Sequence, residues 1–473
     1  MHTATAGSVR RGARHVAMIG LAWLLAASPA VARAGGECAA FRQAFAQAQS
    51  AVATAPFVES PLEAAEGERY LDTSVTSALQ DALATADPEH PIFGRGDQRY
   101  DLGLSNPDNI VYLTRIEPGA EYRIDGQRGN SADLNFQLLV GYPGTGTTGQ
   151  NAGLLRLAEL AVNPDGSFEV TVSANPQPGN WLAATAPADT LVIRETFQDW
   201  EHEQAGSFRL ERIGAAGGGA RPSRTQLLGA LANAAAILQT ESSFYIRFTA
   251  GFLGLIPPGP DNPAPTVLPP NALTPPVETK NGLPGQRSSI VQFALAADEA
   301  MVVSVKRSRF PYQGFEVGNI WFESFESIRH QSSLTTSQAR ADADGLYRFV
   351  IAATDPGVPN WLDTQGALRG FGFMRWQGLD EDLPTDEWPS STIVKLTDLR
   401  ASLPADTPEV SPADRVVELG QRAASAATRL ATTAAPVEEF ARRVSALDLA
   451  TGRACRPSAL LPSNARNPGA FDL

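Results

Sequence analysis

A ten-residue motif in the last third of the chain has a shorter, blurred copy earlier in the sequence. The motif is Asp355-Pro-Gly-Val-Pro-Asn-Trp-Leu-Asp-Thr364, and the copy is Asn175-Pro-Gln-Pro-Gly-Asn-Trp-Leu182. Three landmarks keep nearly one offset: Asn180-Trp181 and Asn360-Trp361 lie 180 residues apart, whereas Asp165-Gly166 and Asp344-Gly345, and also Phe136-Gln137 and Phe315-Glu316, lie 179 apart. Solenoid repeats are only about 20–50 residues long. The long period therefore predicts an internal duplication that produces two related lobes.

The first 34 residues have the pattern of an export signal. Arg10, Arg11 and Arg14 precede an apolar run over residues 16–27, and Ala32-Arg-Ala34 fits cleavage before Gly35. The run is shorter than the roughly 20 apolar residues that span a bilayer. We expect a periplasmic or secreted protein without a later transmembrane segment. The Sec and twin-arginine export routes both stay open.

The net charge bears on the possible binding partners of the protein, and the two cysteines of the mature chain bear on a possible disulfide. Removal of residues 1–34 changes the formal net charge from −13 to −17, because this segment holds four arginines and no acidic residue. An acidic surface repels phosphate backbones, so we expect no nucleic-acid partner. Cys38 and Cys455 lie near opposite ends of the mature chain and are candidates for a disulfide in an oxidising compartment. The oligomeric state is left open.

Apolar residues at helical spacing predict three helical regions. These are N-terminal helices within residues 35–90, a central segment over 222–255, and a C-terminal helix over 408–450 before a tail at 451–473. Ser60-Pro61-Leu62-Glu63 and Ser411-Pro412 have the sequence of helix N-caps. Residues 256–284 are too rich in proline for a helix or a central strand, so we expect an extended connector there.

Short alternating runs between turn signals predict strands in residues 91–214 and again in 285–400. The clearest runs are 110–113, 121–124, 135–139, 167–172 and 190–194 in the first lobe, and 289–293, 300–305, 314–317, 347–351 and 371–375 in the second. We predict a mainly β fold with helical additions, in which two related antiparallel β-sandwich lobes are jelly-roll-like.

The usual cofactor and metal motifs are missing or out of context. Residues 144–149 match the dinucleotide pattern Gly-x-Gly-x-x-Gly, but a βαβ unit does not surround them, so we interpret them as a loop. His90, His202 and His330 are isolated in the mature sequence and lack the spacing of a zinc site. We therefore expect no cofactor and no metal.

Residues peculiar to one copy of the repeat are better site candidates than shared ones, since shared residues serve the architecture. Asp363 and Thr364 stand where the first lobe has Ala183 and Ala184. The second lobe also has Glu316 in place of Gln137. It contains a polar and aromatic cluster that the first lobe lacks, formed by Asn319, Trp321 and Glu323. The ligand-binding candidates are Trp321, Trp361, Asn319, Arg375 and Thr364, and the catalytic candidates are Asp355, Asp363, Glu316 and Glu323. A structural role in ion pairs and turns is the alternative for all of them.

Several of these motifs resemble a known family. Asn106-Pro-Asp-Asn109, Tyr122-Arg-Ile124, and the long motif that starts at Asp355 and leads to Arg375-Trp376 are similar to the bacterial family called domain of unknown function 1214, over roughly residues 100–400. The resemblance implies β-sandwich lobes with helical additions, and it implies no reaction. Relatives often carry a histidine after the glycine that follows the Asp-Thr pair, and here that position is Ala367.

Three functions follow as hypotheses. The first is an exported protein that binds a small or glycan-like, sugar-like or hydrophobic ligand at the second lobe. The second is a carboxylate-dependent enzyme, a hydrolase or lyase acting for example on a glycosidic bond, which needs two carboxyl groups facing one cleft. The third is a structural or assembly component of the cell envelope.

Overall fold

The computed structural model describes residues 29–87, 89–96, 102–141, 149–185, 187–215, 222–278, 282–430 and 434–451. Most of the expected export signal, most of the Gly-x-Gly-x-x-Gly segment, and Cys455 lie outside these residues. The proposed disulfide therefore stays a prediction. Its other member, Cys38, is buried among helices in a hydrophobic cluster.

The first lobe, lobe one, contains strands β1–β9. They are β1 (Gly94–Gly96), β2 (Asn109–Arg115), β3 (Tyr122–Gln127), β4 (Asp133–Val140), β5 (Gln150–Arg156), β6 (Ser167–Ser173), β7 (Asn180–Ala183), β8 (Thr190–Thr196) and β9 (Ser207–Arg212). One sheet has the order β1-β2-β8-β4-β5, and the other has the order β7-β6-β3-β9. Apolar residues of both sheets form one buried cluster, so the sheets pack face to face.

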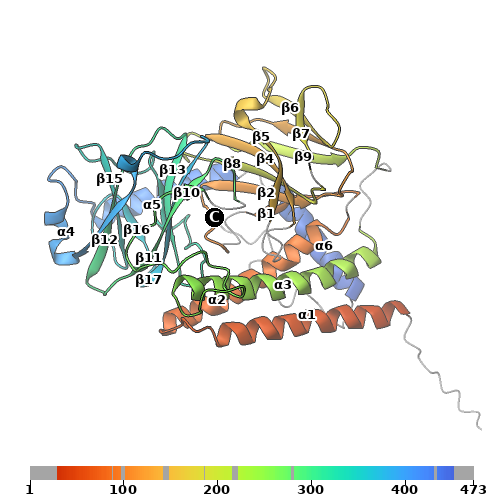
Figure 1. The fold of residues 1–473 in the computed structure, drawn as a ribbon, viewed down its shortest axis with the longest axis horizontal. Coiled ribbons are helices and arrows are strands. Elements are labelled where there is room, and N and C mark those ends of the chain that lie inside the picture. The colour runs from red at the N-terminus through yellow and green to blue at the C-terminus, as the bar shows by residue number, and fades with distance from the viewer. Residues whose placement is uncertain are drawn as a thin grey trace, which may run out of the picture.

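Lobe two contains β10–β18 and repeats this plan. Its strands are β10 (Val277–Glu278), β11 (Arg287–Ala294), β12 (Glu299–Lys306), β13 (Tyr312–Gly318), β14 (Ser333–Thr335), β15 (Leu346–Ala352), β16 (Trp361–Asp363), β17 (Arg369–Gln377) and β18 (Ser390–Lys395). The orders β10-β11-β17-β13-β14 and β16-β15-β12-β18 match those of lobe one strand for strand. Figure 1 shows the two lobes side by side above a layer of helices.

The described sheets are mostly antiparallel, and none of them closes into a barrel. β7 pairs with β6 in parallel, and β16 pairs with β15 in parallel. This pairing departs from the wholly antiparallel, jelly-roll-like lobes that we expected, because jelly rolls are built from antiparallel strands. Nine of the ten strand runs identified in the sequence fall within strands of the structure, and the tenth, 121–124, begins one residue before β3.

The Asn-Trp pair that both lobes share, Asn180-Trp181 and Asn360-Trp361, makes equivalent hydrogen bonds in each lobe. Asn180 exchanges two hydrogen bonds with the backbone of Ala161 at 2.7 and 2.8 Å, and Asn360 does so with Arg340 at the same distances. The indole of Trp361 donates to the Ala352 carbonyl at 2.9 Å, as Trp181 does to Ser173. These bonds hold β7 and β16 against their lobes, so the repeated motif is architectural.

Three helices form a layer beneath the lobes (Figure 1). They are α1 (Pro29–Ala53), α2 (Pro61–Ala84) and α3 (Arg224–Phe252). The predicted capping box at Ser60 and Glu63 is present, and Ser223 caps α3 in the same way. Apolar side chains of the three helices meet α6 (Ala434–Thr451) in a cluster of their own.

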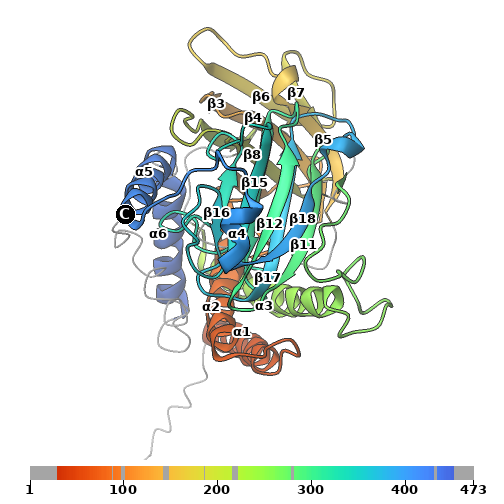
Figure 2. The ribbon, with the colours of Figure 1, turned by 90° about the vertical axis from the view of Figure 1, so that its left-hand side faces the viewer.

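Helix α5 (Pro412–Leu430) lies along both lobes, and the short α4 (Leu396–Ser402) follows β18 (Figure 2). Three arginines at seven-residue spacing face inward from α5, namely Arg415, Arg422 and Arg429. Arg415 donates to Asp355 and to the Val358 carbonyl in lobe two, and Arg429 donates to the Pro107 carbonyl beside lobe one. We predicted a single helix over 408–450, but two helices, α5 and α6, occupy this region. Within the described residues, no helix has both the length and the apolar character of a membrane span.

Candidate functional site

The larger described cavity lies at the junction of the two lobes and has a volume of about 210 Å3. Asn109 and Val111 of β2, together with Arg194 of β8, supply the lobe-one wall, and Arg375 of β17 supplies the lobe-two wall. The remaining lining residues come from two loops: Leu104, Ser105, Asn106, Gly282, Leu283 and Gln286. Two arginines line the cavity, and none of its lining residues is acidic.

The side chain of Arg375 is held in place by three contacts. Its guanidinium forms an ion pair with Glu316, donates to the Leu104 carbonyl at 2.6 Å, and lies 4.0 Å from the centroid of the Phe373 ring. Burial raises the pKa of Glu316 to about 7, although Arg375 and Ser324 favour the ionised form. Leu104 has a left-handed backbone, with φ of 50°, which is costly for a residue with a side chain.

Arg194 differs from Arg375 in having no carboxylate hydrogen-bonded or ion-paired to it among the described residues. Its side chain makes no hydrogen bond or ion pair with the described residues, although it is only partly exposed. Burial and, to a smaller extent, the positive charge of Arg375 lower the pKa of Arg194 to about 10, while Asp133 opposes this effect. The amide of Asn109 is nearby in the same lining, and its buried Oδ1 also accepts no hydrogen bond.

The loop at residues 106–109 connects the lobes beside this cavity. Asp108 accepts a hydrogen bond from the Trp200 indole at 2.8 Å and another from the Tyr312 hydroxyl at 2.7 Å. Asn106 donates to the same hydroxyl at 2.9 Å. Burial raises the pKa of Asp108, although the hydrogen bonds from Tyr312 and Trp200 favour its charged form. The loop thus ties Trp200 of lobe one to Tyr312 of lobe two and sets one edge of the cavity.

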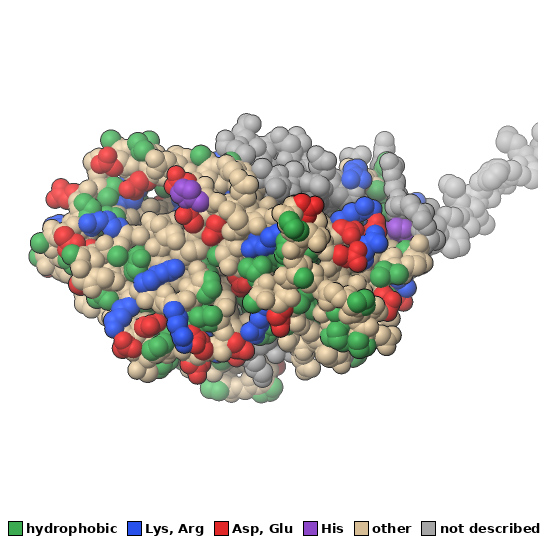
Figure 3. All heavy atoms as spheres, turned by 90° about the horizontal axis from the view of Figure 1, so that it is seen from above, with side chains coloured by type: hydrophobic (Ala, Val, Ile, Leu, Met, Phe, Trp, Pro, Cys, Tyr) green, Lys and Arg blue, Asp and Glu red, His purple; other side chains and the backbone are tan. Residues whose placement is uncertain are grey.

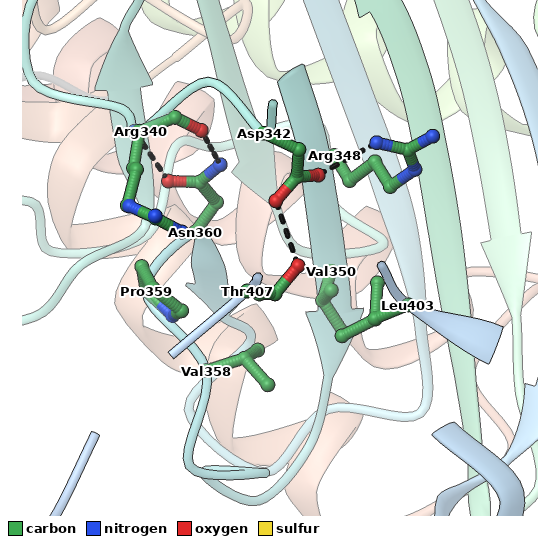
Figure 4. Close-up of a pocket in the computed structure, with 9 residues that line it drawn as sticks. All are labelled: Arg340, Asp342, Arg348, Val350, Val358, Pro359, Asn360, Leu403 and Thr407. Atoms are coloured by element: carbon green, nitrogen blue, oxygen red, sulfur yellow. Dashed lines mark hydrogen bonds and ion pairs between the residues drawn. The ribbon is translucent and has the colours of Figure 1, made fainter. Parts of the chain in front are cut away.

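A second hollow lies beside the repeated motif of lobe two and is shown in Figure 4. Its volume is only about 10 Å3, which is room for roughly one water molecule. Asp342 accepts from Thr407 at 2.7 Å and forms an ion pair with Arg348 at 2.7 Å. Because its polar side chains already bind one another, we do not regard this hollow as a ligand site.

Three of the predicted site residues form a buried turn instead of a pocket wall. Trp321 is 1% exposed, donates to the Glu63 carbonyl at 2.7 Å, and stacks on Tyr70. Asn319 accepts hydrogen bonds from the backbone of Trp321 and Glu323, and it donates to the Glu323 carboxylate. Burial raises the pKa of Glu323, which lies 3.8 Å from Arg69. This group joins lobe two to α2.

The long motif of lobe two places its polar residues in turns and ion pairs. Asp355 pairs with Arg415 at 2.9 Å, and the Thr364 hydroxyl donates to the Ala367 carbonyl at 2.6 Å. Arg415 also lies 5.4 Å from the ring of Trp361, which is 7% exposed. None of these residues lines either of the two cavities.

Asp363 has a partner that the sequence did not reveal. Its Oδ2 lies 2.8 Å from Nδ1 of His330, whose side chain is 45% exposed. Its Oδ1 accepts a hydrogen bond from the backbone of Gln365, which has a positive φ of 51°. We had interpreted His330 as isolated, because the pair is 33 residues apart in sequence. The structure brings the buried Asp363 and the half-exposed His330 together outside the lining of the interlobe cavity.

Of the residues predicted from the sequence, only Arg375 lines the interlobe cavity, with Glu316 directly behind it. Arg194 was missed, although it occupies in lobe one the position that Arg375 occupies in lobe two. Asn106 and Asn109 were noted only as part of a family-like motif. Figure 3 shows acidic and basic side chains interspersed over one face, without a large surface of a single sign.

Comparisons with known proteins give a fold without an activity. No family model matches the chain, and no curated protein does. The crystal structure of an uncharacterized protein from Burkholderia cenocepacia is similar, with 29% sequence identity and a TM-score of 0.67 over 78% of this chain and 98% of that one. A Vibrio parahaemolyticus protein aligns with 12% identity and a TM-score of 0.38 over 68% and 97% of the two chains, which is too distant to guide interpretation. The chain therefore shares a β-rich, two-lobed fold with an uncharacterized bacterial protein of known structure.

Proposed function

We propose that this protein is an exported binding protein that holds a small ligand in the cavity between its two lobes. The observation that carries the proposal is the composition of the cavity wall, which takes residues from lobe one, lobe two and the connector. Small-molecule sites commonly lie at such junctions, where a few polar groups converge. A ligand seated there contacts both lobes at once and stabilises their arrangement.

Two features of the sequence support this proposal. The pattern of residues 1–34 is that of an export signal, which favours a periplasmic or secreted protein. The Asn106–Asn109 motif, part of the resemblance to domain of unknown function 1214, contributes both of its asparagines to the cavity lining. We accordingly move the expected ligand site from lobe two alone to the junction, and we retain Arg375 as one of its residues.

The alternative of a carboxylate-dependent enzyme has less geometric support. Glycosidic hydrolysis needs two carboxyl groups that face a common cleft. The side chains of Asp355, Glu316 and Asp363 are engaged with Arg415, Arg375 and His330 respectively. None of the four candidate carboxylates lines the interlobe cavity.

A matched pair of variants tests the placement of the ligand. Val111→Phe fills the cavity from β2, whereas Leu113→Phe introduces the same side chain two residues further along the strand, outside the lining. The mature proteins are screened by thermal shift against sugars, sterols, terpenoids and aromatic acids. We expect a ligand that raises the melting temperature of the parent and of Leu113→Phe but leaves Val111→Phe unchanged. A ligand that stabilises all three proteins equally would place its site elsewhere and contradict the proposal.

A further inference from the structure

We infer that the ligand of the interlobe cavity is a small oxyanion with one negative charge, bound through the guanidinium of Arg194. This inference rests on the proposed function, because it assigns a chemical class to the ligand of the same cavity. It depends on three observations: the asymmetry between the two copies of the repeat, the lack of an ion pair to Arg194 among the described residues, and the size of the cavity.

The duplication explains why one arginine is paired and the other is not. Arg194 on β8 lies opposite Asn135 on β4, and Arg375 on β17 lies opposite Gly314 on β13. Because Gly314 is the lobe-two equivalent of Asn135, the two arginines hold equivalent positions. The carboxylate that neutralises Arg375 is Glu316, two residues beyond Gly314. The matching residue in lobe one is Gln137, which is neutral and donates instead to the Gly282 carbonyl at 3.2 Å.

The charge of Arg194 is consequently the unbalanced one in the lining. Arg375 forms an ion pair with Glu316, whereas the only carboxylate that acts on Arg194, Asp133, lies outside the lining and forms no hydrogen bond or ion pair with it among the described residues. A charge that is partly withdrawn from water without a partner is destabilising by several kcal/mol in principle. Arginine binds carboxylate and phosphate oxygens through two parallel hydrogen bonds, which are stronger than neutral ones. A bound monoanion would therefore complete in lobe one the ion pair that lobe two already contains.

The cavity volume limits the rest of the ligand. An apolar protein cavity of about 150 Å3 accommodates benzene, with its six carbon atoms. On that scale a cavity of about 210 Å3 accommodates about eight or nine non-hydrogen atoms. Because the cavity is partly open to solvent, a disaccharide would lie largely outside it, whereas an aromatic or short aliphatic carboxylate fits inside. Benzoate is therefore a suitable probe, and benzamide is its neutral counterpart of nearly equal shape.

Isothermal titration of the mature protein with benzoate, benzamide and inorganic phosphate tests the inference. We expect benzoate or phosphate to bind the parent at least tenfold more tightly than benzamide does, and the better of the two anions identifies carboxylate or phosphate as the preferred group. Gln137→Glu recreates the lobe-two ion pair in lobe one and should weaken this binding at least tenfold. Arg194→Gln should weaken it similarly, whereas Arg247→Gln, a change at an exposed arginine on α3, should leave it unchanged.

Two results would overturn the inference, and they differ in what they say about the proposed function. If benzamide binds as tightly as the anions and Val111→Phe abolishes that binding, the cavity binds ligands but not through a charge, so only the anion assignment fails. If none of the three probes binds, a crystal soaked in iodide decides the matter. Iodide beside Arg194 would support an anion site of different shape, and its absence there would reject the site.

Discussion

Thr196 and Gln377 occupy equivalent positions in the two lobes, and they are hydrogen-bonded to each other. The Thr196 hydroxyl donates to Oε1 of Gln377 at 2.7 Å. Contact between equivalent residues is typical of copies related by a two-fold axis. Arg194 and Arg375 lie two residues earlier on the same two strands, so the axis that relates the lobes runs close to the cavity. The ligand site that we propose is thus a product of the duplication.

Truncation of Trp321 should destabilise the fold rather than remove a ligand contact. Trp321→Ala deletes a side chain that is 1% exposed, so we expect a loss of about 3–5 kcal/mol in the free energy of unfolding. Trp388, which is 39% exposed, provides the matched control Trp388→Ala, for which a much smaller loss is expected. Urea denaturation measures both values. Equal costs for the two variants would show that the turn at 319–323 is not a core element.

Arg422 of α5 should contribute more to stability than an arginine on a solvated face. It donates to the Ser327 carbonyl and to the Ser333 hydroxyl, and it lies 4.3 Å from the Trp200 ring centroid. Arg422→Met keeps an unbranched apolar stem but removes the guanidinium and leaves these acceptors without their donor, at a cost of about 2–4 kcal/mol. The neighbouring change Gln421→Met, on the exposed side of the helix, is the control. The expectation fails if thermal unfolding of both variants matches that of the parent.

The stability of the protein should decrease between pH 6 and pH 8 because of Glu241. Burial raises the pKa of this carboxyl to about 8, and nearby Asp81 adds to the shift. The group is protonated more readily in the folded state than in the unfolded state, whose pKa is about 4.3. Its stabilising contribution is therefore complete below the unfolded pKa and is lost as the pH rises through about 8.

Glu241→Gln removes this titration. We expect the decline in unfolding free energy between pH 6 and pH 8 to become shallower by up to about 1 kcal/mol per pH unit. Glu68→Gln on the exposed face of α2 should leave the decline unchanged. Denaturant titrations at several pH values measure the slope, and identical slopes in Glu241→Gln and the parent would refute the assignment.

Anion affinity should increase as the pH falls from 8 to 6. Glu316, with a pKa of about 7, becomes neutral over this range and leaves the charge of Arg375 uncompensated beside the cavity. An additional uncompensated positive charge in the cavity lining contributes on the order of 1 kcal/mol, or about fivefold in affinity. Glu316→Gln should bind benzoate at pH 8 as tightly as the parent does at pH 6. A parent affinity that is constant with pH would argue against this coupling.

Local sequence patterns were sufficient for the elements but not for the site. The cap at Ser60 and the strands around the Asp-Gly turns depend on neighbouring residues, so their patterns are readable in the sequence. Trp321 was misinterpreted as a ligand contact because its burial depends on Tyr70, far away in the chain. The strand β7 was not predicted, because its Asn180-Trp181 pair was interpreted only as a landmark of the repeat.

The cavity itself could not be predicted, because its walls meet only after both lobes have folded. One signal was nevertheless present in the sequence. Arg194 and Arg375 hold equivalent places in the repeat, and Gln137 stands where Glu316 stands, so a comparison of the two copies reveals an arginine without a carboxylate. The arginines at 415, 422 and 429 carried a similar signal, a seven-residue period of basic residues that face inward.

A crystal structure of the mature protein grown with benzoate tests the central claim most directly. We predict density for the ligand in the interlobe cavity, with its carboxylate on the guanidinium of Arg194 and its ring toward Val111. Water alone in the cavity, with benzoate bound elsewhere or absent at saturating concentration, would contradict the account.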